Sequence, residues 1–263
     1  MIFDQERIPG EEKDAGFEYY RHLFAYDFAR RFCAGKRVLD LGCGYGYGTA
    51  ILASSAASAS GADFSAAAVA KAGRTYSAVP NVSFSRQDAR AMTFKDGEFE
   101  VCCSFQVIEH FKEPAAVLSE LKRVTAPGGS VIISTLNAEI SGSVFNPYHF
   151  KEYGRAEFLG LLTPHFASVE LYGVMASPAI TESMKAFKAK ARRLASLDVL
   201  GLSKHPESEL VRGLYSFAVL SARAAFRIGR KPENFSLSDF SAEQGAEGPC
   251  IDFIAVCSAG GGK

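Results

Sequence analysis

The sequence predicts an α/β fold in which a mostly parallel sheet carries helices on both faces. Between residues 36 and 174, short apolar runs alternate with longer segments of helical periodicity, as in repeated βα units. The first apolar run leads directly into a stretch in which Gly42, Gly44, Gly46 and Gly48 alternate with other residues and which opens a helix. A chain of 263 residues, 48% hydrophobic and 22% charged, is typical of one soluble domain, with or without a sizeable insertion.

The expected strands are short and apolar, and the expected helices lie between them. Ser65 suits the N-cap of the second helix, and Pro114 suits the first turn of the third. Strands are predicted at 37–41, 59–64, 81–89, 99–105, 130–137 and 168–175, and helices at 49–57, 65–77, 113–125 and 155–166. A last strand at 249–259 follows a long helical segment.

Two segments flank the core, which we assign to residues 36–175 and 249–260. Residues 1–35 are a predicted N-terminal helical lid, because aromatic residues recur at helical spacing over 17–33. This helix either packs over the sheet or covers a ligand through Tyr19, Tyr20 or His22. Residues 176–248 are a predicted helical insertion, with helices at 181–200 and 208–231 and a polar loop at 232–248.

Charge is segregated along the chain, although the formal net charge is zero. Residues 181–231 contain eleven Lys/Arg and four Asp/Glu, a net charge of +7. The two helices either pack on the domain with their charges in water, or cap the substrate pocket and attract an anionic substrate or a membrane surface. They are equally a candidate homodimer interface. No separate nucleic-acid-binding module is visible, so we expect no nucleic-acid partner.

The cysteine pattern and the chain start bear on location and metal content. The six cysteines form no CxxC pair, so their spacing predicts no metal site. No signal peptide and no uncharged apolar run of about 18 residues are visible. We expect a cytoplasmic protein, with any contact to the inner face of a membrane being peripheral.

Three carboxylates narrow the ligand of the glycine loop. Asp40 precedes the loop, which contains no Lys or Arg, so the loop is a poor site for an anionic pyrophosphate. Asp63 ends the second strand, where an acid can accept the two hydroxyls of a ribose. Asp88 ends the third strand, where it can accept from an exocyclic amine such as that of adenine. A nucleoside with a cationic part fits these residues, and S-adenosylmethionine meets that description better than NAD.

These residues carry a family resemblance. The stretch "VLDLGCGYGYGT" resembles motif I of the class I S-adenosylmethionine-dependent methyltransferases (methyltransferase type 11-like), and "FEVCCSFQVIEHFKEP" and "LKRVTAPGGSVIIST" continue the match. The resemblance implies a Rossmann-like seven-stranded sheet, mostly parallel, whose antiparallel last strand lies between strands five and six, with the helical insertion before it. The segments "ERIPG", "HLFAYDFA" and "NPYHFKEYGRAEF" resemble a bacterial subgroup associated with glycan modification.

The resemblance also implies a cofactor-binding set. Gly42 and Gly44 would lie beside the methionine part of the cofactor, with Asp40 near its amino group. Asp63 would bind the ribose, Phe64 would lie beside the adenine, and Asp88 with the Ala89 backbone would bind the adenine amine. Phe105 and Gln106, at the end of the fourth strand, would line the methionine side.

Methyl transfer to an oxygen of high pKa needs a base or a group that stabilises the forming oxyanion. His110, next to Glu109, and His149 both follow strands on the side where ligands of such folds bind. We expect His149 or His110 to serve as base and Tyr148 to orient the acceptor hydroxyl. Each histidine has an alternative role in holding its loop together, and Glu109 could bind substrate or cap a helix.

The sequence therefore predicts a methyltransferase that modifies a small-molecule or glycan acceptor at an oxygen, on a sugar or on a lipid-linked or phosphorylated compound. Two alternatives stay open at this stage. One is an NAD-dependent oxidoreductase, which shares the glycine loop after a first strand. The other is a catalytically inactive protein that kept the fold and the cofactor site.

Overall fold

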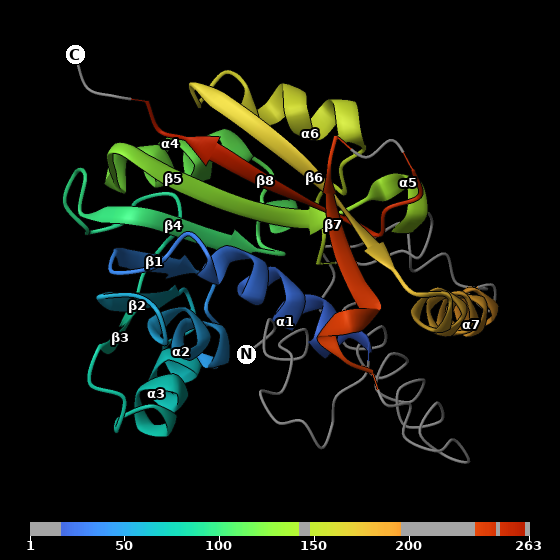
Figure 1. Ribbon diagram of the computed structural model, residues 1–263, viewed down its shortest axis with the longest axis horizontal. Helices are drawn as coiled ribbons and strands as arrows, with labels where there is room; N and C mark the ends of the chain where they lie inside the picture. Colours follow the sequence, from blue (N-terminus) through green and yellow to red (C-terminus); the bar gives the residue numbers. More distant parts are fainter. Residues whose placement is uncertain (1–16, 142–147, 196–234, 246–247, 261–263) are drawn as a thin grey trace.

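The computed structural model describes residues 17–141, 148–195, 235–245 and 248–260. Within them, one sheet runs through the molecule in the order β3-β2-β1-β4-β5-β8-β6-β7 (Figure 1). Its strands are β1 (Arg37–Leu41), β2 (Ser58–Asp63), β3 (Val82–Arg86), β4 (Phe99–Phe105), β5 (Thr125–Leu136), β6 (Ser168–Ala176), β7 (Phe240–Gln244) and β8 (Asp252–Ser258). β8 pairs antiparallel with both β5 and β6, so the last strand lies where the sequence placed it.

The described part of the sheet has eight strands rather than seven. The additional strand, β7, lies in the stretch that the sequence predicted to be a polar loop, and it pairs antiparallel with β6 from Tyr172↔Gln244 to Ala176↔Phe240. Only Phe240 of this strand is buried. An edge strand needs little apolar surface of its own, and the composition of β7, rich in Ser, Glu and Gln, therefore concealed it.

Helices cover both faces of the sheet, as predicted (Figure 1). They are α1 (Phe17–Arg30), α2 (Tyr47–Ala53), α3 (Ala66–Thr75), α4 (Pro114–Val124), α5 (Ala138–Ser141), α6 (Arg155–Leu162) and α7 (Pro178–Ala195), with 3₁₀ turns η3 (Ile108–His110) and η5 (Leu237–Asp239). Ser65 caps α3 by accepting a hydrogen bond from the Ala68 N–H, and Pro114 begins α4. The first helix after the glycine loop is shorter than predicted, and β5 begins five residues earlier, at Thr125, with a register shift against β4.

Two hydrophobic cores result from the alternation of side chains along the buried strands. Leu39 and Leu41 of β1 belong to the core on the α4 and α6 side. Val38, which alternates with Leu39 along β1, belongs to the core formed with α1, α2 and the start of α7. Because central strands bury both faces, their sequences are almost continuously apolar, and this made them predictable.

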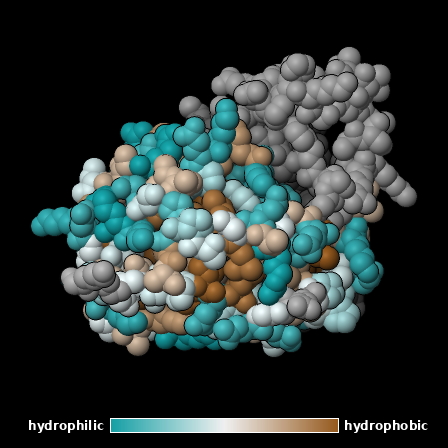
Figure 2. Space-filling view, turned by 90° about the horizontal axis from the view of Figure 1, so that it is seen from above, coloured by the Kyte–Doolittle hydropathy of each residue, from teal (hydrophilic) through white to brown (hydrophobic). Residues whose placement is uncertain are grey.

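Few large hydrophobic side chains of the described residues are exposed. Seen from above, hydrophilic side chains surround a central group of hydrophobic ones (Figure 2). Among the described residues, the exposed large hydrophobic side chains are those of Phe64, Ile140 and Phe150. Phe64 follows the carboxyl end of β2, and the other two follow that of β5. None of the described helices is long and apolar enough to cross a membrane.

The flanking segments are described only in part. Helix α1 corresponds to the aromatic helix expected over 17–33, and α7 to the first helix of the basic insertion. Met184 of α7 is buried against the domain, whereas Lys185 is exposed and pairs with Glu182 at 2.9 Å. The predicted helix at 208–231 and residues 1–16 lie outside the described residues. The division of the chain into lid, core and insertion stays a prediction.

Candidate functional site

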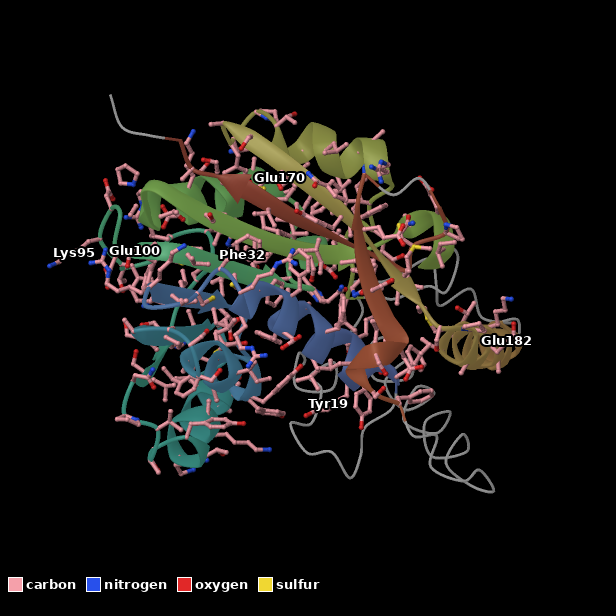
Figure 3. All side chains as sticks on the ribbon, in the orientation of Figure 1. Tyr19, Phe32, Lys95, Glu100, Glu170 and Glu182 are labelled. Carbon is pink, nitrogen blue, oxygen red and sulfur yellow. The ribbon has the colours of Figure 1, made fainter. Side chains whose placement is uncertain are left out.

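The candidate site lies at the carboxyl ends of the parallel strands, where the strand order reverses around β1. Chain connections run from β1 to β2 and β3 on one side and then to β4 and β5 on the other, so the loops after β1 and β4 diverge. Such a switch point is the usual ligand crevice of open α/β sheets. In Figure 3, Glu100 marks the amino end of β4, and Tyr19 lies on α1 toward the carboxyl ends.

The glycine loop after β1 is held in a conformation that only glycine adopts easily. Gly42, Gly44 and Gly46 have φ values of 83°, 53° and 84°. The N–H groups of Gly42 and Cys43 both donate to the Ala62 carbonyl, at 2.7 and 3.1 Å, which fixes the loop against β2. A Cβ on Gly42 would overlap the Val107 side chain. The loop is therefore a tight backbone cradle that a ligand can approach closely.

Asp40 lies beneath this cradle and is fully buried. Its carboxylate accepts hydrogen bonds from the hydroxyls of Thr49 (2.6 Å) and Tyr26 (3.2 Å), which tie β1 to α2 and α1. Burial raises the pKa of Asp40 to about 7, although these two hydrogen bonds act in the opposite direction. When ionised, this carboxylate would favour a cation above the loop, but its two described hydrogen-bond donors belong to α1 and α2 of the protein itself. The predicted place of Asp40 near the cofactor's amino group stays a proposal.

Asp63, at the end of β2, is bonded to the loop itself. Its Oδ2 accepts from the Gly44 N–H at 2.9 Å and its Oδ1 from the Ser65 N–H at 2.8 Å. Asp63 is 8% exposed and is the last residue of β2. The predicted ribose contact of Asp63 stays a proposal.

The residues assigned to the adenine differ in their exposure and in the hydrogen bonds that they already make. Phe64 is 57% exposed, which is unusual for a phenylalanine, and Arg86 lies over its ring at 5.3 Å. Both oxygens of Asp88 are already engaged by the Arg90 guanidinium, at 3.0 and 2.7 Å. These bonds hold the pKa of Asp88 at about 2. An adenine amine would therefore have to share this carboxylate, whereas Ala89 is buried beside it and offers only its backbone.

Phe105 and Gln106 end β4 in different environments. Phe105 is buried and meets the Tyr26 ring edge-to-face at 4.8 Å, so it supports α1. Gln106 has a φ of 55°, which lies in the left-handed region. Among the described residues it is the only residue other than glycine with a positive φ. Its Oε1 is buried with no hydrogen-bond partner among the described residues. A buried acceptor without a donor is costly, and an unusual backbone conformation often marks a functional position.

The three candidate catalytic residues come together beyond β4 and β5. The His110 and His149 rings meet edge-to-face with centroids 4.9 Å apart. His110 Nδ1 lies 3.0 Å from the Tyr148 carbonyl oxygen, and His149 Nδ1 lies 2.9 Å from the Glu152 carboxylate. Tyr148 is buried, and its described bond uses the backbone rather than the hydroxyl. The two histidines are thus oriented by hydrogen bonds, and the role of the Tyr148 hydroxyl stays a prediction.

Glu109 is the most buried member of this region. It is fully buried, and burial raises its pKa to about 7. The Glu109 carbonyl accepts the N–H groups of Phe150 and Lys151, at 2.8 and 3.3 Å, which fastens the loop after β5 to η3. The sequence suggested only a substrate-binding or capping role for Glu109.

The structure adds residues that sequence reasoning missed. Tyr26 and Thr49 hold Asp40, and Glu152 orients His149. The spacing of Glu152 three residues after His149 was the one available signal. On α1, Arg21 pairs with Asp252 of β8 at 3.3 Å. Burial and the Arg21 charge lower the pKa of His22 to about 3, so His22 is neutral at pH 7.

The residues present fit S-adenosylmethionine. The cradle at Gly42 and Gly44 admits a backbone-hugging ligand, and the exposed Phe64 ring offers a stacking face. The buried Gln106 Oε1 lacks a donor among the described residues, and an ammonium group would supply one. No phosphate-binding Lys or Arg lies in the loop.

Comparison with known proteins agrees with this chemistry. Residues 39–133 match the family model described as "Methyltransferase domain". A relative from Mycolicibacterium smegmatis, named a probable S-adenosylmethionine-dependent methyltransferase, is 32% identical over 183 residues, which cover 68% of this chain and 70% of the relative. The chain belongs to the S-adenosylmethionine-dependent methyltransferases. The cofactor is accordingly S-adenosylmethionine, and the oxidoreductase alternative is set aside.

Further similarities agree with the family and the fold. A Mycobacterium tuberculosis protein with the same kind of name is 28% identical over 169 residues, and the match covers 62% of this chain and 61% of that protein. The YcgJ protein of Bacillus subtilis superposes with a TM-score of 0.57 at 15% identity, covering 92% of this chain and all of YcgJ. The [4+2]-cyclase SpnF superposes with a TM-score of 0.60 at 19% identity, covering 93% and 82%. Such likenesses show the fold alone.

Proposed function

We propose that this methyltransferase transfers the methyl group to an oxygen of a small-molecule or glycan acceptor, with the acceptor hydroxyl deprotonated at the His110–His149 pair. When bound, S-adenosylmethionine supplies a methyl group already activated on a sulfonium. The task of this chain is therefore alignment, exclusion of water and removal of one proton.

The main support for His149 as the base is its orientation by Glu152. A carboxylate at 2.9 Å from Nδ1 holds the imidazole in the tautomer that carries a proton on Nδ1 and presents Nε2 as acceptor. An acceptor hydroxyl that reaches Nε2 can then pass its proton to the ring while its oxygen forms the bond to the methyl carbon. The positive imidazolium that results is stabilised by the same carboxylate.

Oxygen as acceptor atom has independent support among the relatives. A Pseudomonas aeruginosa protein named ubiquinone biosynthesis O-methyltransferase is 36% identical over 115 residues, which cover 43% of this chain and 49% of that protein. Its name supports a small-molecule hydroxyl as acceptor here. The glycan, phosphorylated or lipid-linked character of the acceptor rests on the local sequence resemblance and on the +7 charge of residues 181–231. The same segment is the basis of the proposed membrane contact and of the proposed homodimer.

Labelled methyl transfer tests the proposal. Purified protein is incubated with S-adenosylmethionine that carries a tritiated methyl group and with separate pools of phenols, phosphorylated sugars, nucleotide sugars, lipid extract, amines and thiols. Alkali-stable methyl ethers are counted separately from methylated amines and thioethers. We expect transfer to one pool, reduced by about 10²–10⁴-fold in His149→Gln. The control His165→Gln, a histidine before the amino end of β6, should transfer at the wild-type rate. Transfer to amine or thiol acceptors only would contradict the oxygen assignment.

A further inference from the structure

Three potential metal ligands converge where the loops after β4 and β5 meet. One ligand atom from each of Glu109, His110 and His149 lies within 4.8 Å of the other two. The set combines two imidazoles with one carboxylate, a combination found in three-ligand catalytic metal sites that keep an open position. Two of the three come from η3 and the third from the loop that the Glu109 carbonyl fastens beside it.

The buried carboxylate is an independent indication that this cluster takes a cation. Glu109 is fully buried, its Oε2 accepts a 3.3 Å bond from the Thr135 hydroxyl, and its Oε1 has no hydrogen-bond partner among the described residues. Burying a carboxylate is costly unless its charge and its lone pairs are compensated. A cation between Glu109 and the two imidazoles would compensate both.

The hydrogen bonds of the histidines have the pattern of a second coordination shell. Metal-binding histidines almost always give their other ring N–H to a carbonyl or carboxylate, which fixes the tautomer and aims the ligand nitrogen. His110 Nδ1 faces the Tyr148 carbonyl at 3.0 Å, and His149 Nδ1 faces the Glu152 carboxylate at 2.9 Å. Both bonds assign Nε2 as the coordinating atom.

We infer that Glu109, His110 and His149 form a binding site for a divalent transition-metal cation of the Mn²⁺ or Zn²⁺ type. Imidazole ligands favour such ions over Mg²⁺ and Ca²⁺, which prefer oxygen. The site itself stands on these three residues, and its role rests on the proposed function. The cation would hold the acceptor oxygen at its open position and lower the pKa of the hydroxyl. Because both Nε2 atoms are then ligands of the cation, the proton leaves to water instead of to an imidazole, the oxygen bonds the methyl carbon, and the carbon–sulfur bond breaks with its electron pair on sulfur.

Metal binding is measured without any acceptor. The full chain is stripped with EDTA and titrated with Mn²⁺, Zn²⁺ and Mg²⁺ by calorimetry, and free Mn²⁺ is followed by electron paramagnetic resonance. We expect one Mn²⁺ or Zn²⁺ per chain, with Zn²⁺ bound more tightly, and at least tenfold weaker Mg²⁺ binding. Glu109→Gln and His149→Gln should each weaken Mn²⁺ binding by at least tenfold, and Glu152→Gln by about tenfold or more. His165→Gln should bind as the wild type does.

Circular dichroism reports whether each variant folds. A measurement on the wild type tests the site where a variant does not fold. Electron spin echo spectra of bound Mn²⁺ should show ¹⁴N couplings from coordinated imidazole. Their absence, or equal Mn²⁺ binding by the wild type and a folded His149→Gln, would overturn the site. Methyl transfer unaffected by EDTA, together with no metal binding, would overturn it and leave the proposed function standing. Metal binding by the three residues without transfer to any hydroxyl would overturn the function and leave the site.

Discussion

Gly42→Ala should weaken both the fold and cofactor binding. The Gly42 φ of 83° lies in the left-handed region, where an L side chain costs about 1–2 kcal/mol. The new Cβ also overlaps the Val107 side chain, and relieving such overpacking costs about 1–3 kcal/mol. Reduced freedom of the unfolded chain offsets about 0.4–1 kcal/mol. We expect a net loss of about 1–5 kcal/mol in the free energy of unfolding.

Urea unfolding and calorimetry with S-adenosylmethionine measure the two effects separately. A displaced loop should lower affinity by about tenfold or more, which corresponds to about 1.4 kcal/mol. Gly73→Ala is the matched control, because Gly73 lies in α3 with open space where its Cβ would be. That substitution should stabilise by about 0.5–1 kcal/mol and leave affinity unchanged.

A double variant divides the loss between its two causes. Val107→Ala in the Gly42→Ala background removes the overlapping methyl groups but leaves the backbone strain, so part of the stability should return relative to the sum of the single changes. A Gly42→Ala protein that unfolds within about 0.5 kcal/mol of the wild type and binds the cofactor equally well would refute the reasoning, since this is the scatter of neutral substitutions.

Three further substitutions test the site. Asp40→Asn should reduce the pH dependence of the free energy of unfolding. The Asp40 carboxyl has a pKa of about 4 in the unfolded chain and about 7 in the folded protein, so the folded state holds a proton that the unfolded state has lost. The contribution of Asp40 to the free energy of unfolding therefore falls by about 1.4 kcal/mol for each pH unit between these values. The stability difference, variant minus wild type, should rise by up to about 4 kcal/mol from pH 4 to 7 in urea unfolding, and a constant difference would contradict the raised pKa. Phe64→Ala should lower cofactor affinity by about fivefold or more with little change in stability, and Phe64→Leu should be intermediate. The exposed ring has Arg86 over it but adds little to the core, so its proposed role is to stack on the adenine. Equal calorimetric affinities would exclude stacking. Gln106→Met should leave the fold at least as stable and lower cofactor affinity by about tenfold. The substitution removes Oε1, a buried acceptor with no donor among the described residues, which the ammonium group of the cofactor would bind. Unchanged affinity would place the methionine ammonium elsewhere.

Local patterns in the sequence determined the class of fold, the central strands and the methyl donor. Strands β1, β4 and β5 were predictable because they are buried on both faces and hence almost uniformly apolar. The glycine loop was predictable because a tight backbone cradle after a strand needs glycines. The ribose contact of Asp63 stays a prediction. Strand β7 escaped prediction because its stability comes from pairing with β6 rather than from its own side chains.

Only the tertiary structure decided what the buried polar groups do. Tyr26 lies 14 residues from Asp40, and His149 lies 39 residues from His110, so no local pattern joins either pair. Folding brings the two histidines together because the parallel strands β4 and β5 deliver their following loops to one edge of the sheet. Tyr26 reaches Asp40 because α1 packs on one face of the sheet. The same folding removes Glu109 from water, raises its pKa and leaves one of its oxygens without a described partner. Periodicity reports which residues are buried, whereas the pairing of buried charges depends on contacts between distant segments, and the sequence alone does not contain those distances.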